Sequence, residues 1–255
     1  FRSGNKIYER DFGSSGNDIM FDIGYAYNNH LILGGCAPYG VSGDKTIAGY
    51  GYLDNWFIIT DTAGNKISEH IFGGLQTEEF TRLQPTSDKG WLLCGTSYSD
   101  AGFDKSENNL GKEQTWVVKV DSMMNKVWDK TLLTDCDTIF HDENAFAFET
   151  LDGCYIIANS TNAGIGGDKS QPNQDASNNT DDYFIAKFCD TSTVGAAPVV
   201  NLASSDTNFC EKQCIDFFDL STNNPVSWQW HFTGAVPDTS TLDRKSTRLN
   251  SSHRT

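Results

Sequence analysis

The sequence contains no apolar run that approaches the roughly 20 residues needed to cross a bilayer, and it is poor in positive charge. Nineteen Lys and Arg stand against 34 Asp and Glu in 255 residues, which leaves a formal net charge of −15. Such a surface repels phosphate backbones and anionic headgroups, so we expect no nucleic-acid partner and no membrane insertion. Apolar residues make up 38% of the chain, enough for one large or two small folded domains.

Sequence motifs of familiar catalytic and metal chemistry are also missing. There is no His-Glu-x-x-His, no Gly-x-Ser-x-Gly, no phosphate-cradling glycine loop and no Cys-x-x-Cys pair. The cluster that looks most catalytic is His141-Asp142-Glu143, a basic group beside two carboxylates. We interpret it as structural and expect neither enzymatic activity nor a zinc site.

No segment shows a sustained helical period. Short runs rich in β-branched and aromatic residues alternate with Gly, Asn and Asp, a pattern typical of strands joined by turns. In one stretch of the chain we expect strands at 66–72, 79–84, 91–95 and 115–121.

The chain repeats itself at an interval of sixty residues. Asn5-Lys6-Ile7 recurs as Asn65-Lys66-Ile67 and as Asn125-Lys126-Val127. Trp56 recurs at Trp116 and, more loosely, at Tyr183, while Asp44-Lys45 recurs as Asp104-Lys105 and as Asp168-Lys169. Three units result, at about 5–64, 65–124 and 125–193, and insertions enlarge the third.

The stretch from Trp56 to Ile67 predicts a strand, a tight turn and a second strand, with Gly64 at the positive φ that such a turn needs. In the second unit Met124 replaces this glycine. Because a bulky residue is strained at positive φ, we expect Asn125 to adopt that conformation instead.

Five phrases of the repeat carry a resemblance to a known family. They are Ser42-Gly-Asp-Lys-Thr46, Lys89-Gly-Trp-Leu-Leu-Cys-Gly95, Trp116-Val-Val-Lys-Val-Asp121, Asn125-Lys-Val-Trp-Asp-Lys130 and Gly167-Asp-Lys-Ser170. These phrases are similar to the repeats, of about sixty residues, in large secreted proteins of the Bacteroidetes. The resemblance spans residues 4–193 and implies export through the type IX pathway to the outer cell surface or the medium.

Four strands per unit, each unit exposing apolar positions that only a neighbour can cover, favour the blades of a β-propeller. We therefore expect an all-β fold with a partial β-propeller of three four-stranded blades over residues 1–193. Trp56 and Trp116 are expected in the blade core. Three blades cannot close a ring that takes four to eight, so we expect an open arc with exposed edges that aggregates on its own.

A second module follows a small-residue linker at 194–197 and covers residues 198–242. Alternation places Trp228, Trp230 and Phe232 on one face of a strand. The phrase from Asp219 to Phe232 resembles the signature of the PKD domain, an immunoglobulin-like β-sandwich, which implies that Trp230 packs in its core. Only the N-terminal part of that domain is present, so we expect an incomplete sandwich.

Residues 243–255 resemble the in-frame translation of a sequencing-library adapter, and we set them aside as an artefact. On this interpretation the coding sequence was cut before its natural end. Phe1 also begins in the middle of the repeat pattern, so we expect the natural protein to extend beyond both ends.

Seven cysteines at irregular spacing are consistent with an exported protein. Cys210 and Cys214 flank a short turn and predict a local disulfide. The alternative is that one of them pairs with a cysteine outside this sequence. Cys94 lies in an apolar run and is expected to be a buried free thiol.

The recurring Asp-Lys turns are the candidate interaction residues, because long loops gather on one propeller face, where ligands commonly bind. Asp44, Asp104 and Asp168 are the residues in question. The alternative interpretation is that these aspartates accept backbone hydrogen bonds in a turn while their lysine neighbours are solvated.

Calcium is the one cofactor that we consider, because carboxylates crowd the loop of the third unit. The candidate ligands are Asp168, Asp175, Asp181 and Asp182. The pattern does not match an EF-hand, and the alternative is a polar insertion without a metal.

Together these features predict a non-catalytic secreted or cell-surface adhesion protein that binds a glycan or an extracellular protein, alongside the rest of its own chain. The alternative is an accessory region of a multidomain extracellular enzyme that degrades polysaccharide, because PKD modules accompany such enzymes.

Overall fold

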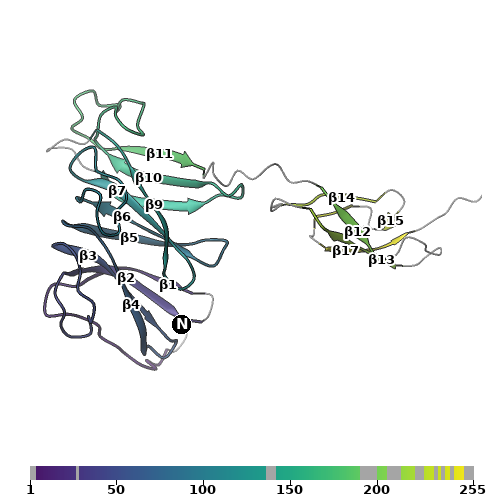
Figure 1. The fold of residues 1–255 in the computed structure, drawn as a ribbon, viewed down its shortest axis with the longest axis horizontal. Coiled ribbons are helices and arrows are strands. Elements are labelled where there is room, and N and C mark those ends of the chain that lie inside the picture. Colours follow the sequence, from purple (N-terminus) through teal and green to yellow (C-terminus); the bar gives the residue numbers. More distant parts are fainter. Residues whose placement is uncertain are drawn as a thin grey trace, which may run out of the picture. The chain divides into compact units, whose positions relative to one another are not determined.

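The computed structural model describes residues 4–26, 29–135, 142–189, 200–205, 214–221, 227–232, 235–236, 239–241 and 244–249. All regular structure in these ranges is β-sheet, which confirms the all-β fold (Figure 1). The described residues hold no helix long and apolar enough to span a bilayer. The chain forms two compact units, one of residues 1–150 and 154–188 and the other of residues 151–153 and 189–255.

The first unit consists of three antiparallel sheets that follow one another along the chain, here called sheets 1, 2 and 3. Sheet 1 contains β1 (Ile19–Tyr25), β2 (Leu31–Pro38), β3 (Leu53–Thr60) and β4 (Lys66–Phe72). Sheet 2 contains β5 (Glu78–Pro85), β6 (Trp91–Ser97), β7 (Gln114–Val120) and β8 (Lys126–Leu132). Sheet 3 contains β9 (Asp142–Glu149), β10 (Tyr155–Thr161) and β11 (Asp182–Phe188).

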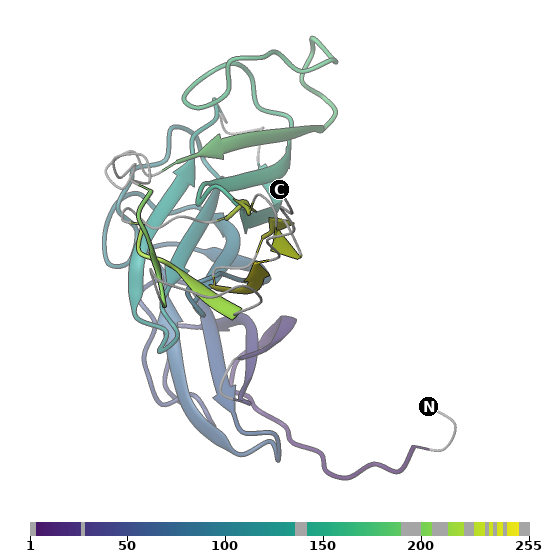
Figure 2. The ribbon, with the colours of Figure 1, turned by 90° about the vertical axis from the view of Figure 1, so that its right-hand side faces the viewer.

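Each strand in these sheets pairs with the strand that follows it, and the sheets lie in sequence order from purple to green in both ribbon views (Figures 1 and 2). Strands β4 to β7 confirm the four strands expected between residues 66 and 121. Sheet 3 has three described strands where four were expected. The segment after β11 that would supply a fourth includes residues 190–199, which lie outside the described residues.

Apolar side chains on both faces of the middle strands bind the sheets to one another. Phe57 of β3 and Phe80 of β5 meet edge to face, with ring centroids 5.0 Å apart, in the core between sheets 1 and 2. Leu92, Val117 and Ile157 are buried in a second core, between sheets 2 and 3. Each such side chain contributes about 1.5–3 kcal/mol when fully buried. The strands β6 and β7 are buried along their whole length because a sheet covers each face.

The structural repeat is offset from the sequence units by one strand, because β4 lies in the second sequence unit but completes sheet 1. Trp56 and Trp116 occupy equivalent places: they pair with Gly35 and Gly95 respectively, and both indoles are buried. The looser match at Tyr183 is one residue out of register. Phe184 takes the tryptophan position in the core, and Tyr183 is 96% exposed.

The second unit contains two small antiparallel sheets. One has the order β12 (Leu202–Ser204), β13 (Cys214–Asp219), β17 (Arg244–Leu249), β15 (Ala235–Val236), and the other pairs β14 (Trp230–His231) with β16 (Thr239–Ser240). Trp228, Trp230 and Phe232 are half-buried and the residues between them are exposed, as the alternation predicted. The rings of Trp230 and Phe232 stack with centroids 5.9 Å apart.

Two sequence predictions concern less well described parts of this unit. The segment 243–255, which we set aside from the fold, contributes β17, and β17 pairs with β13 along five residues. Its origin as a translated adapter stays a prediction. Cys210 lies outside the described residues, and Cys214 is described only as part of β13, so the proposed disulfide between them also stays a prediction.

Candidate ligand-binding face

The antiparallel order of the sheets places successive loops at alternate ends of the first unit. The loops 39–52, 73–77, 98–113 and 162–181 therefore share one end, the left in Figure 1, and together form what we call the loop face. The opposite end carries the short turns 61–65, 86–90 and 121–125. All three Asp-Lys turns lie on the loop face, as the repeat predicted.

The three aspartates of these turns make the same contact. Each carboxylate accepts a hydrogen bond from the backbone N–H of one residue, and each aspartate N–H donates to the carbonyl of that same residue, at 2.7–3.2 Å. Two of these partner residues directly follow β4 and β8, and the third lies sixty positions earlier, before β1. The pairs are Asp44 with Gly13, Asp104 with Gly73 and Asp168 with Leu133. Because the partners are also sixty residues apart, these carboxylates clamp one repeat to the next.

The neighbouring lysines are buried, so the expectation that they are solvated is wrong. Lys45, Lys105 and Lys169 are each less than 5% exposed. Their ammonium groups point into the loops: Lys45 Nζ, for example, donates to the carbonyls of Gly40 at 2.9 Å and Ile47 at 2.8 Å. Burial lowers the pKa of Lys105 to about 8. Each loop is wound around a buried cation that satisfies its carbonyls, which makes the loop rigid.

Buried carboxylates near the first residues of β3 and β5 also hold the loops of this face in place. Asp54 Oδ2 accepts from the N–H of Tyr50 at 2.9 Å, and Glu78 Oε2 accepts from Gly74 at 2.7 Å. Burial raises the pKa of Asp54 to about 6 and that of Asp142 to about 6. A carboxyl group with a raised pKa is often catalytic. The carboxylate of Asp54, however, accepts a hydrogen bond from the loop backbone and so has a structural role.

Asp142 also has a structural environment. Its carboxylate lies in the protein interior and accepts hydrogen bonds from the hydroxyl of Thr134 at 3.1 and 3.2 Å. His141, the base of the His-Asp-Glu cluster, lies outside the described residues.

The four calcium candidates are engaged separately. Asp168 clamps Leu133, and Asp175 closes its own turn by accepting from the N–H of Ser177 at 3.0 Å. Asp182 accepts from the N–H of Gln174 at 2.6 Å, and Asp181 is exposed. Within the described ranges, no three His, Cys, Asp or Glu side chains are grouped so as to hold a metal ion.

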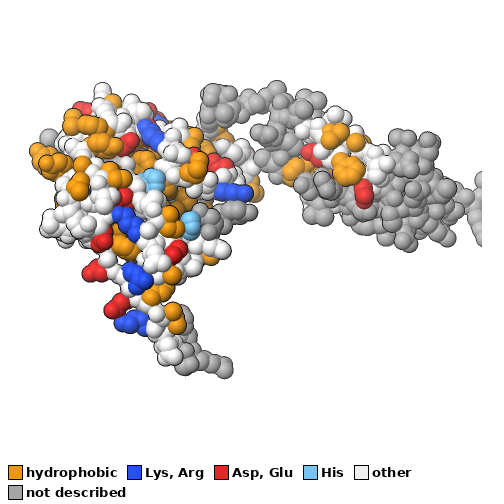
Figure 3. Space-filling view, turned by 60° about the horizontal axis from the view of Figure 1, so that its bottom comes forward, with side chains coloured by type: hydrophobic (Ala, Val, Ile, Leu, Met, Phe, Trp, Pro, Cys, Tyr) orange, Lys and Arg blue, Asp and Glu red, His pale blue; other side chains and the backbone are white. Residues whose placement is uncertain are grey.

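Exposed aromatic side chains on the loop face are the feature that the sequence analysis missed. We define the aromatic patch as Tyr39, Tyr50, Tyr52 and Phe103. Tyr52 and Phe103 are 79% and 61% exposed, and the rings of Tyr50 and Phe103 stack with centroids 4.5 Å apart although they belong to neighbouring sheets. Apolar side chains gather at this end of the first unit in the space-filling view (Figure 3). The sequence signal that could have predicted this patch is the presence of three tyrosines in the glycine-rich loop 39–52.

Backbone hydrogen bonds lock the loops that carry the patch. The N–H of Tyr52 donates to Gln76 O at 2.8 Å, and Gln76 Nε2 donates to Tyr98 O at 2.8 Å. Within the first loop the N–H of Gly49 donates to Tyr39 O at 2.7 Å. The aromatic rings therefore stand on a preorganised surface, which lowers the entropy lost on binding.

Phe103 has a backbone conformation that its residue type disfavours. Its φ is 53°, where the equivalent positions of the other two repeats are Gly43 (φ 57°) and Gly167 (φ 58°). A side chain in this left-handed region costs about 1–2 kcal/mol. Strained residues concentrate at functional sites, and the exposed Phe103 ring gives little burial in return. Phe103 is therefore the strongest single indication of a binding surface.

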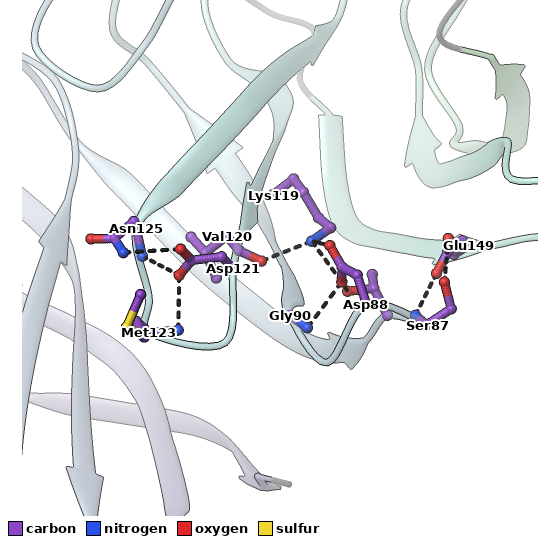
Figure 4. Close-up of polar contacts among 10 residues, drawn as sticks. Ser87, Asp88, Gly90, Lys119, Val120, Asp121, Met123, Asn125 and Glu149 are labelled. Atoms are coloured by element: carbon purple, nitrogen blue, oxygen red, sulfur yellow. Dashed lines mark hydrogen bonds and ion pairs between the residues drawn. The ribbon is translucent and has the colours of Figure 1, made fainter. Parts of the chain in front are cut away.

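At the opposite end of the sheets, polar groups pair with one another (Figure 4). Asp121 Oδ1 accepts from the N–H groups of Met123 at 2.8 Å and Asn125 at 2.9 Å, and Asp61 makes the equivalent turn in sheet 1. The buried Lys119 bonds Asp88 at 2.8 Å. These contacts are structural.

The expectation that Asn125 adopts positive φ in this turn is wrong. Met124 itself has a φ of 65°, at the position where Gly64 has 77°. The Met124 side chain is buried in the core between sheets 1 and 2. Its burial offsets the backbone strain.

The prediction for Cys94 concerns a residue that the structure describes. Cys94 is a buried free thiol, as expected, and so is Cys36. Burial raises the pKa of both thiols to about 12, so they are unreactive. Cys154 and Cys189 are each disulfide-bonded.

A scan against protein-family models and a search of the curated proteins found no match to this chain.

Proposed function

We propose that this chain is a non-catalytic, exported interaction protein whose aromatic patch binds a glycan. The observation that carries the proposal is the stacked pair Tyr50 and Phe103, two exposed rings from adjacent sheets on a rigid loop face. Exposed aromatic clusters mark binding sites. Flat rings cover the apolar faces of sugars, and the tyrosine hydroxyls supply hydrogen bonds to the sugar hydroxyls.

The charge of the chain narrows the class of ligand. With a net charge of −15 the protein repels anionic polymers, so a neutral glycan is favoured over an acidic one. Burial, together with the carboxylates of Asp104 and Asp54, raises the pKa of Tyr50 and keeps its hydroxyl protonated as a donor.

Export is supported by the two disulfide-bonded cysteines, Cys154 and Cys189, because disulfides persist in oxidising compartments. The assignment of residues 198–242 to the PKD family and the type IX route of export remain proposals that rest on the sequence resemblance.

The test is a glycan array probed with the full chain. We expect binding to neutral glycans that falls at least tenfold in Tyr52→Ala and in Phe103→Ala. Tyr25→Ala is the matched control, because Tyr25 is an equally exposed aromatic residue at the opposite end of sheet 1. Binding that survives both patch substitutions, or binding only to a basic protein, would overturn the glycan assignment.

A further inference from the structure

One buried carboxyl group lies between two neighbouring loops of the loop face. The side chain of Asp54 is completely buried. Its Oδ2 accepts hydrogen bonds from the N–H groups of Tyr50 at 2.9 Å and Gly51 at 3.3 Å, in the loop 39–52. A Cβ atom added at Gly73 would lie 1.9 Å from Oδ1, so this second oxygen faces the backbone of the next loop. Asp54 therefore touches one loop with each of its oxygens.

The backbone of Gly73 also fixes the position of Phe103. The N–H of Gly73 donates to Asp104 Oδ2 at 3.1 Å, which is one of the three repeated clamps. Phe103 directly precedes Asp104, and its ring stacks on that of Tyr50. The backbone segments that position the two stacked rings therefore meet at the carboxyl group of Asp54.

The second repeat has a neutral side chain at this junction. Gln114 lies at the position equivalent to Asp54, sixty residues later. Its Oε1 accepts from the N–H of Leu110 at 2.8 Å, just as Asp54 Oδ2 accepts from Tyr50. Its Nε2 donates to Thr134 O at 2.6 Å. One acceptor and one donor on a single side chain therefore join two segments at this end of the sheets.

Asp54 supplies the acceptor but, when it is ionised, lacks the donor. The carbonyl equivalent to that of Thr134 belongs to Gly74. Asp54 Oδ1, which corresponds to the Gln114 nitrogen, has no hydrogen-bond partner among the described residues. A carboxylate oxygen cannot donate, whereas the hydroxyl of a protonated carboxyl group can donate to a backbone carbonyl. Ionisation therefore leaves a buried acceptor unpaired against the glycine backbone, which is unfavourable.

The groups around Asp54 favour its neutral form. The ionisable side chains that interact with it are Lys45, Tyr50, Cys36 and Glu78, and Asp104 is bonded to the adjacent Gly73. Lys45 is the one cation among these described groups, and its ammonium donates to the carbonyls of Gly40 and Ile47. Burial raises the pKa of Asp54 to about 6 against the effect of the backbone N–H groups, and the charge of Glu78 adds to the rise.

We propose that the protonated side chain of Asp54 joins the two halves of the aromatic patch, so that glycan binding is strong in mildly acid solution and weakens as this side chain ionises. The inference rests on the proposed function and adds regulation to it. The hydroxyl of the protonated group donates to a carbonyl of the turn Gly73-Gly74. Ionisation removes this bond, and the loops that carry Tyr50 and Phe103 then separate more readily. Only the joined loops present the stacked pair, so the apparent affinity falls with the fraction of chains in which they are joined.

The test is the affinity of the full chain for an array of neutral gluco-, galacto- and manno-oligosaccharides at pH 5 and pH 8. Binding by the parent should weaken at least tenfold at the higher pH, since a pKa shift of about two units allows a change of up to about a hundredfold. Asp54→Asn should bind at both pH values as tightly as the parent does at pH 5, because its amide donates at every pH. The control is Asp61→Asn, which removes one negative charge from the opposite end of sheet 1 and should keep the pH profile of the parent.

Hydrogen exchange separates this proposal from the glycan assignment, because it needs no sugar. The amides of Tyr50 and Gly51 should exchange faster in the parent than in Asp54→Asn at pH 8 and equally at pH 5. Comparison at the same pH cancels the intrinsic effect of pH on exchange. This result without binding to any glycan would refute the glycan assignment and support the junction at Asp54. Equal exchange in the two chains at pH 8, or glycan binding by the parent that does not change with pH, would overturn the proposal.

Discussion

The indole Nε1 of Trp116 donates a 2.9 Å hydrogen bond to Oδ2 of Asp129. Trp56 and Glu69 make the same bond at 2.8 Å one repeat earlier. Asp129 Oδ2 also accepts from the N–H of Ser106, in the Asp-Lys turn. In sheets 1 and 2 a single buried carboxylate therefore ties the third strand, the fourth strand and a turn of the loop face together.

Replacing Trp116 by Phe should destabilise the protein by about 1.5–3 kcal/mol at pH 7, because a hydrogen bond to a charged acceptor is lost. Burial alone would raise the pKa of Asp129, but hydrogen bonds from Lys126 and Trp116 outweigh it and hold the pKa below its ordinary value. The contribution of a depressed carboxyl is present above its unfolded pKa and is lost as the pH falls through the folded value.

The penalty of Trp116→Phe should therefore shrink once the pH falls below the unfolded pKa of about 3.9, and urea unfolding at pH 7 and at about pH 2 measures it. Trp91→Phe is the control, because Trp91 is buried and the described structure shows no hydrogen bond from its indole to a carboxylate. Equal pH dependence in the two variants would contradict the assigned role of Asp129.

Met124→Gly should destabilise the protein by about 1–2 kcal/mol even though it removes strain. Glycine relieves the φ of 65°, which is worth about 1–2 kcal/mol. It also removes a buried side chain from the core between sheets 1 and 2, at a cost of about 2–4 kcal/mol. Chemical denaturation gives the difference, and a variant more stable than the parent would show that backbone strain dominates at this turn.

Asp54→Asn should change how stability depends on pH. Burial raises the pKa of Asp54 to about 6, above the unfolded value, and Oδ1 has no hydrogen-bond partner among the described atoms. The stability that the protonated group contributes is present below about pH 4 and is lost as the pH rises through 6, up to about 3 kcal/mol. Gln114, the equivalent residue of sheet 2, shows that an amide suits the site.

Thermal unfolding at pH 4 and pH 7 checks this prediction. The variant should gain stability relative to the parent as the pH rises. A difference that is the same at both pH values would contradict it.

Phe103→Asn and Gly43→Ala should have opposite effects on stability although the two positions are equivalent in the repeat: the first should leave stability unchanged, and the second should lower it. Asparagine tolerates positive φ, so Phe103→Asn should keep stability within about 0.5 kcal/mol while glycan binding is lost. Alanine at position 43 would place Cβ 2.3 Å from Gly13 O at a φ of 57°, and we expect a loss of more than about 1 kcal/mol. Melting curves and the glycan array separate the two effects, and a strongly destabilised Phe103→Asn would mean that the ring is structural.

The strands and their period were predictable because both are local properties. Alternation and turn residues mark β4 to β7 within a few residues of their observed ends. The candidate site was less predictable. The sequence places Asp44, Asp104 and Asp168 in equivalent loops, but only the contact of Asp44 with Gly13, 31 residues away, shows that these carboxylates act as clamps.

The order of residues alone determined the sixty-residue repeat, the all-β class and the hairpin from Trp56 to Ile67, since hydrophobic pattern and turn chemistry act over a few neighbouring residues. Tertiary structure decided the burial of Lys45, the left-handed backbone of Met124 and the stacking of Tyr50 on Phe103. Each of these depends on what a neighbouring sheet or a distant part of a loop places beside the residue, and the free energy of that contact outweighs the local preference.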